Sequence, residues 1–172
     1  WADGARDVVC IHGPPGTGKT RTLTAYVQHA VVRGKSVLIS AHSNQAVDHL
    51  LVGDSTPDDP EPDTLHALAQ DPESRLSIAR VGSNTRSRVV QECYIDNSPT
   101  RASVVAATTS GASQFDQNEF DVAIVDEATQ ASRPATAIVL NCAKKLILAG
   151  DHKQLPPYCA DESHKEEDMH IS

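Results

Sequence analysis

The chain has 172 residues, which is enough for one domain with a substantial hydrophobic core. Hydrophobic residues make up 39 percent of it, and no apolar run approaches the roughly 18 residues of a transmembrane helix, so we expect a globular protein without a membrane partner. The formal net charge of −8 argues against a nucleic-acid partner unless the charges are unevenly distributed.

The acidic residues are in fact concentrated in two segments. Residues 54–73 carry seven acidic side chains and no Lys or Arg, and residues 161–168 carry five acidic side chains against one Lys. These segments account for −7 and −4, which leaves +3 for the rest of the chain, so a basic groove can exist elsewhere. The most basic stretch contains five arginines: Arg75, Arg80, Arg86, Arg88 and Arg101. They are candidates for non-specific phosphate contacts, although surface solvation is the commoner role of such residues.

The four cysteines are scattered along the chain without a C-x-x-C pair: Cys10, Cys93, Cys142 and Cys159. We expect reduced thiols and a cytoplasmic protein, with the two cysteines that lie in apolar runs buried in the core. A zinc site formed by Cys159, His164 and His170 is conceivable, but three ligands in a charged tail support it weakly.

The first part of the chain predicts two strands and two helices. A strand at Asp7–His12 is followed by a glycine-rich loop and by a helix over residues 18–32, which ends at Gly34. A second strand, Ser36–Ser40, leads into a short helix, Asn44–Val52, whose apolar residues share one face.

The rest of the chain predicts four more strands. Residues 53–63 are rich in Pro and Asp and cannot bury apolar surface, so we expect an acidic loop there. A helical turn is predicted at Thr64–Gln70, and residues 83–93 fit either a helix or a loop. The further strands are Ile78–Val81, Ser103–Thr108, Asp121–Asp126 and Lys145–Ala149. Strands that alternate with helical segments predict an α/β fold, a mostly parallel sheet with helices on both faces.

The loop at residues 13–20 reads G-P-P-G-T-G-K-T and matches the phosphate-binding pattern G-x-x-x-x-G-K-[ST] in full, between a strand and a helix. In such a loop the backbone N–H groups and the helix N-terminus face phosphates. Lys19 is expected to reach the β and γ phosphates, and the Thr20 hydroxyl to bind Mg²⁺. We therefore expect ATP and Mg²⁺ as cofactors. The predicted nucleotide contacts are Gly13, Pro14, Pro15, Gly16, Thr17, Gly18, Lys19 and Thr20.

A second acidic motif follows the apolar run 122–125. Phosphoryl transfer needs a carboxylate for the Mg²⁺ shell and a base for the attacking water. Asp126 and Glu127 supply both at the carboxyl end of a strand, where α/β folds bind ligands. We expect Asp126 to be a metal-shell residue and Glu127 to be the catalytic base. The alternative is a solvated Asp–Glu pair that begins a helix.

Five sequence motifs occur in a fixed order between Ile11 and Pro157: I-H-G-P-P-G-T-G-K-T, V-L-I-S-A-H-S-N-Q-A-V-D-H-L, A-T-T-S-G-A-S, V-D-E-A-T-Q-A-S and L-A-G-D-H-K-Q-L-P-P. Together they resemble superfamily 1 helicases, and most closely the Upf-like group, whose members act on DNA or RNA. The resemblance implies a RecA-like P-loop domain and ATP hydrolysis coupled to movement along single-stranded nucleic acid.

The resemblance also implies roles for individual residues. Ser43 and Asn44 match a motif that touches the nucleic-acid backbone. A second nucleic-acid motif is matched by Thr108, Thr109 and Ser110. Gln154 matches the catalytic glutamine that senses the γ-phosphate. The structural alternatives are a helix N-cap for Ser43 and Asn44, and turn formation for Asp151, which we favour for Asp151.

The resemblance further implies a domain organisation. Residues 1–158 correspond to the first of two RecA-like domains, residues 159–172 form an acidic tail, and the second RecA-like domain is expected as a partner outside these residues. Because arginines of that second domain complete the active site in the family, we expect the chain alone to bind ATP–Mg weakly and to hydrolyse little. Two other readings are a P-loop ATPase switch that regulates a protein partner, and a non-catalytic binding module.

Overall fold

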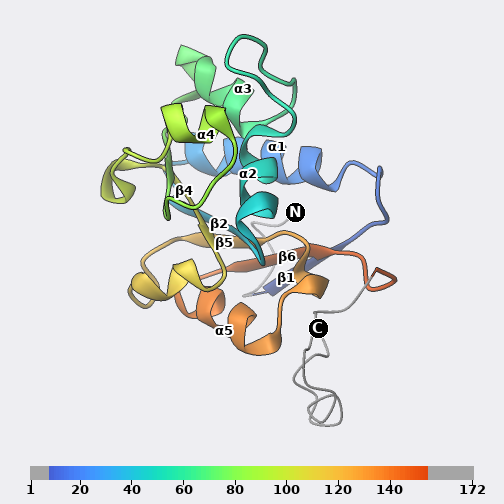
Figure 1. Ribbon diagram of the computed structural model, residues 1–172. Coiled ribbons are helices and arrows are strands. Elements are labelled where there is room, and N and C mark those ends of the chain that lie inside the picture. The colour runs from blue at the N-terminus through green and yellow to red at the C-terminus, as the bar shows by residue number, and fades with distance from the viewer. Residues whose placement is uncertain (1–7, 155–172) are drawn as a thin grey trace.

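The computed structural model describes residues 8–154, which form one six-stranded sheet whose strands are all parallel (Figure 1). The strand order is β1-β6-β5-β2-β4-β3. The strands are β1 (Val8–His12), β2 (Val37–Ala41), β3 (Ile78–Arg80), β4 (Val104–Thr108), β5 (Val122–Val125) and β6 (Leu146–Gly150). This arrangement confirms the predicted parallel α/β fold.

Helices cover both faces of the sheet. They are α1 (Lys19–Val32), α2 (Asn44–Val52), α3 (Leu65–Gln70), α4 (Arg88–Cys93) and α5 (Arg133–Asn141). Figure 1 shows α1 to α4 on one side of the sheet and α5 on the other. Strand β2 contributes to both layers, because Val37 and Ile39 pack under the first group of helices while Leu38 packs with Val139 of α5. Burial on both faces is what a parallel sheet requires.

The predicted elements agree with the observed ones to within one or two residues, with two exceptions. The ambiguous stretch 83–93 divides into a loop and the short helix α4. Helix α5 was not predicted, although Pro134 in its first turn and Ser132 at its N-cap are typical of a helix start. Gly34 does end α1: its φ is 72° and its N–H donates to Val31 O at 2.8 Å.

The position of β1 at the edge of the described sheet corrects one expectation. Cys142 is buried as expected, but Cys10, in the other apolar run, is exposed. The reason is that β1 pairs only with β6 in the part of the chain that the structure describes. The residues of the suggested zinc site, Cys159, His164 and His170, lie outside the described residues. No helix between residues 8 and 154 is long and apolar enough to cross a membrane.

Candidate functional site

The parallel sheet brings the predicted site residues to one edge. Because all strands run the same way, the segment after each strand lies at the carboxyl edge of the sheet. In sheet order, the segments that follow the strands are 13–20, 151–154, 126–127, 42–44, 109–110 and 81–87. Segments separated by more than a hundred residues in the sequence therefore lie next to one another.

The phosphate-binding loop depends on glycine at several positions. Gly16 and Gly18 have φ values of 73° and 83°, in the left-handed region that residues with a Cβ rarely adopt. Gly18 is the N-cap of α1, and its carbonyl accepts from Thr22 N at 2.9 Å. A Cβ on Gly13 would lie 2.6 Å from Thr17 Oγ1. The loop thus presents N–H groups and a helix N-terminus, the usual cradle for phosphate.

Lys19 is the first residue of α1 and lies over this loop. Its Nζ donates to Gly13 O at 2.6 Å and to Pro14 O at 3.2 Å. Gly13 N in turn donates to Gly150 O at 3.2 Å, which ties the loop to the end of β6. The lysine charge is therefore held at the centre of the predicted phosphate site.

Asp126 and Glu127 follow β5 beside the phosphate-binding loop. Asp126 N donates to Ser40 O, and Asp126 Oδ1 accepts from Glu127 N, both at 2.9 Å. Burial raises the pKa of Asp126; the Glu127 N–H and the Lys19 charge oppose the rise only in part. Asp126 is therefore not a solvated carboxylate, and the segment 128–130 that follows is a 3₁₀ turn rather than the start of an α-helix.

Glu127 is more exposed than Asp126 and has an unexpected neighbour. Its backbone is left-handed, with a φ of 49°, and its carboxylate lies 3.5 Å from His42 Nδ1. Sequence reasoning missed His42. The signal was its position directly after β2, the strand that pairs with β5.

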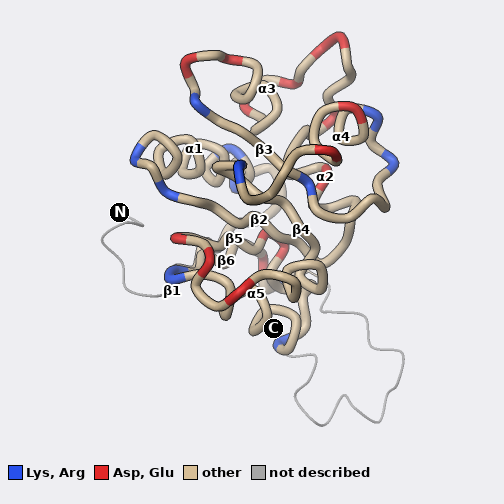
Figure 2. The backbone as a smooth tube through the Cα atoms, turned by 90° about the vertical axis from the view of Figure 1, so that its left-hand side faces the viewer, with Lys and Arg blue, Asp and Glu red and all other residues tan. Residues whose placement is uncertain are grey.

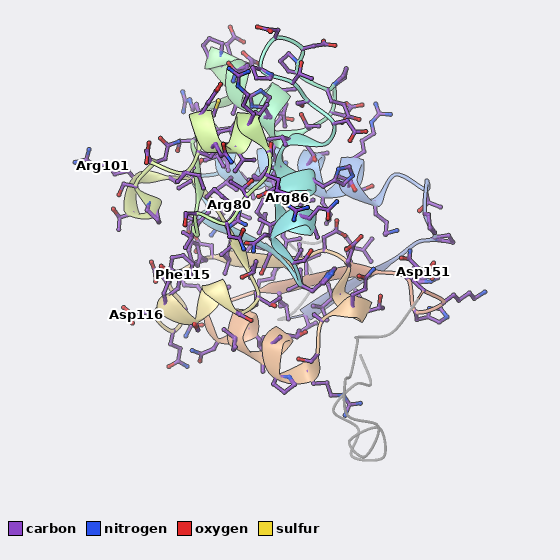
Figure 3. All side chains as sticks on the ribbon, viewed as in Figure 1. Arg80, Arg86, Arg101, Phe115, Asp116 and Asp151 are labelled. Carbon is purple, nitrogen blue, oxygen red and sulfur yellow. The ribbon has the colours of Figure 1, made fainter. Side chains whose placement is uncertain are left out.

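The turn that follows β6 contacts the end of the neighbouring strand β1 through the side chain of Asp151. Asp151 Oδ1 accepts from Lys153 N at 3.0 Å, and Asp151 O accepts from Gln154 N at 3.0 Å. The Lys153 N–H lowers the pKa of Asp151. Its carboxylate also lies 3.3 Å from Nε2 of His12, another residue that sequence reasoning missed. The hydrogen bonds of Asp151 confirm the turn interpretation, and Figure 3 shows Asp151 in this turn after β6. The turn places Gln154 at the same sheet edge as the phosphate-binding loop.

The two segments expected to touch nucleic acid follow the neighbouring strands β2 and β4. Ser43 Oγ accepts from Ala46 N at 3.2 Å, so Ser43 is the N-cap of α2. Thr108 Oγ1 accepts from Gly111 N at 3.0 Å. Thr109 is only 3 percent exposed, so its side chain does not reach the surface, whereas Ser110 is exposed. Thr108 and Ser110 are thus the accessible side chains of this segment.

The acidic loop 53–63 folds back toward the phosphate-binding loop. Asp54 N donates to Glu61 Oε2 at 2.6 Å, and Asp63 Oδ2 lies 3.3 Å from Arg21 Nε. A cavity of about 390 Å³ separates residues 61–64 from the phosphate-binding loop. Figure 2 shows the concentration of acidic residues in the segment that leads into α3.

Comparison with known proteins identifies the family of this chain. A family model described as an AAA domain matches residues 2–96 and 83–162. The chain belongs to this AAA-domain family. Among the relatives of this AAA domain, "DNA-binding protein SMUBP-2" of Mesocricetus auratus is 33 percent identical over 200 residues, covering 88 percent of the chain and 20 percent of the relative.

A second relative is "DNA replication ATP-dependent helicase/nuclease DNA2" of Gallus gallus, which is 36 percent identical over 159 residues, covering 89 percent of the chain and 16 percent of the relative. These matches confirm the resemblance of the AAA domain to superfamily 1 helicases of the Upf-like group. The AAA domain spans only 10 to 30 percent of the length of such relatives.

Solved helicase structures share the fold of this AAA domain. The arterivirus nonstructural protein 10 helicase, solved with DNA, superposes with a TM-score of 0.54 at 18 percent identity, over 91 percent of the chain and 31 percent of that protein. The UvsW helicase from bacteriophage T4 gives a TM-score of 0.52 at 14 percent identity, over 97 percent of the chain and 52 percent of that protein. The AAA domain therefore has the RecA-like fold of helicases.

Proposed function

We propose that this domain binds ATP–Mg²⁺ and forms the first half of the motor of an ATP-dependent DNA or RNA helicase. The observation that carries the proposal is the shared sheet edge. The phosphate-binding loop and Asp126–Glu127 lie in one half of that edge, and the segments 43–44 and 108–110 lie in the other half. In a helicase motor, the nucleotide site and the nucleic-acid site must both contact the same rigid element, because hydrolysis at one site has to change binding at the other.

The residues present fit a nucleotide with its metal ion. Thr20 offers a hydroxyl, and Asp126 offers a buried carboxylate whose ionised form is disfavoured until a cation is near. These two residues would hold the Mg²⁺, which neutralises phosphate charge when bound. Lys19 binds the phosphates as a second cation, since its amine lies over the loop carbonyls.

Glu127 is the base in this proposal. Its side chain is 44 percent exposed and therefore accessible to a water molecule, and the carboxylate accepts the proton of that water during attack on the γ-phosphate. His42 lies against this carboxylate and orients it. Gln154 reports the state of the γ-phosphate through the turn that it closes with Asp151.

The ligand along which the helicase moves in this proposal is single-stranded nucleic acid. Relatives are named as a DNA-binding protein and as ATP-dependent helicases of DNA replication, which supports this substrate class. Since the relatives are about three to ten times longer than the matched region, we expect a second RecA-like domain of the complete protein to close over the nucleotide and supply the transition-state arginine.

The direct test is nucleotide binding by the Lys19→Ala variant, measured by the fluorescence of N-methylanthraniloyl-ATP. We expect binding to be lost, because the positive charge at the centre of the loop is removed. Lys35→Ala is the matched control, since Lys35 lies at the amino end of β2, on the opposite edge of the sheet, and pairs with Asp121. Equal affinity of both variants for the nucleotide would remove the loop from its role.

The second test uses the complete protein and measures ATP hydrolysis with and without single-stranded nucleic acid. Stimulation by the strand, lost in Glu127→Gln while nucleotide binding is kept, is expected of a helicase motor. Hydrolysis that does not respond to the strand would instead favour an ATPase switch that regulates a protein partner.

A further inference from the structure

A group of three metal-binding side chains lies where the turn after β6 meets the end of β1. It consists of His12, Asp151 and His152, and each of them offers one ligand atom. These three atoms all lie within 4.8 Å of one another. Figure 3 shows Asp151 at this turn. None of the three residues is among the expected contacts of nucleotide, Mg²⁺ or nucleic acid, so the proposed function does not explain the group.

The distance between the first two ligand atoms suits a tetrahedral metal site. His12 Nε2 lies 3.3 Å from Asp151 Oδ1. Nitrogen and oxygen ligands lie about 2.0–2.2 Å from Zn²⁺, and two such atoms at a tetrahedral angle are therefore about 3.4 Å apart. An ordinary N–H···O hydrogen bond is shorter, at about 2.7–3.2 Å. The two side chains are thus spaced as ligands of one ion rather than as partners in a strong hydrogen bond.

His152 supplies the third ligand atom. Its ring centroid lies 4.5 Å from that of His12, and the two ring planes are inclined by 37°. The side chain is exposed and makes no hydrogen bond to any residue in the range 8–154. It can therefore rotate, and a movement of about 1.4 Å at most, from 4.8 to 3.4 Å, brings its nitrogen to the spacing of a zinc ligand.

The backbone holds the other two ligands in place. His12 is the last residue of β1 and pairs with Gly150 of β6, the residue directly before Asp151. Asp151 is only 5 percent exposed, and its Oδ1 accepts from Lys153 N at 3.0 Å. Outer hydrogen bonds of this kind commonly orient the ligands of a metal ion. Only His152 has to move when an ion binds.

A cavity of about 480 Å³ gives an ion access to the group. Both histidines line it, and half of the His12 side chain is exposed, so the cavity is open to solvent. Its volume leaves room for the water molecule that completes the coordination of an open zinc site. Arg133 of α5 also lines the cavity, but salt in the solvent screens its charge.

We propose that His12, Asp151 and His152 bind a divalent transition metal ion, for which Zn²⁺ is the best fit, with water in the remaining position. Imidazole ligands suit Zn²⁺, whereas Mg²⁺ prefers an octahedral shell of oxygen atoms. The ion is therefore distinct from the Mg²⁺ that accompanies the nucleotide. It joins the residue before the phosphate-binding loop to the turn that ends at Gln154, and so fixes these two segments relative to each other. The inference goes beyond the proposed function and does not depend on it.

The first test is a Co²⁺ titration of the metal-free chain, without nucleotide and without a histidine tag. Co²⁺ takes the place of Zn²⁺ at nitrogen and oxygen ligands, and at a four-coordinate or five-coordinate site it absorbs visible light more strongly than the hydrated ion does. We expect this absorption to saturate, to be abolished by Zn²⁺ and to persist in excess Mg²⁺. A wild-type chain that binds neither Co²⁺ nor Zn²⁺ would overturn the proposal.

The second test removes single ligands. His152→Ala removes an exposed imidazole, and His12→Gln keeps a side-chain donor for Asp151 but loses the imidazole. We expect the affinity of each variant for Co²⁺ to fall at least about tenfold, since even the loss of an outer-shell partner has an effect of this size. Without metal their thermal unfolding midpoints should equal that of the wild type, and Zn²⁺ should raise the wild-type midpoint more than theirs. Undiminished Co²⁺ binding in either variant would contradict the site.

The control addresses the other zinc ligands that the sequence suggests. A triple variant, Cys159→Ser with His164→Ala and His170→Ala, removes these candidate ligands together. We expect it to bind Co²⁺ as the wild type does. Loss of Co²⁺ binding in the triple variant would assign the ion to the segment after residue 154 and overturn the proposal. A thiolate-to-cobalt band in the near-ultraviolet spectrum of the wild type would do the same, because the proposed site contains no thiol.

Discussion

Arg80 donates through Nε to Asp48 Oδ1 at 3.0 Å, and the arginine side chain has no exposed surface. The pair joins β3 to α2 across 32 residues of sequence. Each of the three guanidinium nitrogens donates a hydrogen bond, because Nη1 donates to Val81 O and Nη2 to Asn44 Oδ1. A buried charge pair of this kind is tolerated only when additional hydrogen bonds compensate the loss of water.

Breaking this pair should destabilise the domain strongly. In Asp48→Ala the buried guanidinium loses its counter-ion, and we expect the free energy of unfolding to fall by about 3–5 kcal/mol. Arg88→Ala is the control, since it removes an exposed ion pair, with Glu92, that solvent screens, and it should lower the free energy of unfolding far less than Asp48→Ala. Urea unfolding of both variants measures the difference. Similar values for the two would contradict the contrast between buried and exposed pairs.

Asp126→Asn should raise the thermal stability of the domain and weaken its Mg²⁺-dependent nucleotide binding. Because burial raises the pKa of Asp126, its ionised form destabilises the folded state at neutral pH. The variant should therefore melt at a higher temperature than the wild type at pH 7, whereas its Mg²⁺-dependent nucleotide binding should weaken. The stability gain should be complete above the raised pKa and vanish as the pH falls below the unfolded value of 3.8, where both chains are neutral at this position. A lower melting temperature at pH 7 would refute this account.

Tyr94→Phe tests a buried contact far from the proposed chemistry. The Tyr94 hydroxyl lies 2.6 Å from His66 Nδ1, and both residues are buried. Removal of the hydroxyl leaves a buried imidazole nitrogen without its partner, so we expect a loss of about 1–3 kcal/mol in the free energy of unfolding. Urea unfolding measures it. Nucleotide affinity, measured on the folded variant, should not change, and a change would mean that the α3–α4 contact reaches the phosphate-binding loop.

Asp63→Asn should strengthen nucleotide binding. Asp63 lies beside the phosphate-binding loop and pairs with Arg21. Its removal takes away a negative charge that repels phosphates and frees the arginine, so we expect about a twofold to threefold gain in nucleotide affinity at low salt. The gain should disappear in molar salt, where the screening length falls to about 3 Å. Asp58→Asn, a change of equal charge in the same loop but outside the cavity lining, should have the smaller effect.

Local sequence patterns were sufficient for most of the fold. Alternation of apolar runs and helical segments located all six strands, because a strand buried on both faces needs a run of apolar residues wherever it occurs. Helix α5 was not predicted, because it lacks a clear apolar pattern. Only Val139 of this helix is fully buried, so its apolar face is short and its periodicity weak.

The site was predictable where its chemistry is local. The phosphate-binding loop is contained in eight consecutive residues, and Asp126–Glu127 directly follows an apolar run. His12 and His42 were not predictable in the same way. Each histidine contacts a carboxylate that follows a different strand. Which strands are neighbours depends on the sheet order rather than on the order in the chain.

The sequence by itself determined the RecA-like class of this domain and the position of its phosphate-binding loop, because both follow from short-range patterns and from glycines that permit a left-handed backbone. Only the tertiary structure decided the roles of the arginines. Arg80 and Arg86 are six residues apart in one basic stretch, yet one is buried against Asp48 and the other is exposed and unpaired within the described residues. Burial and pairing are set by distant segments that packing brings together, and no local pattern encodes them.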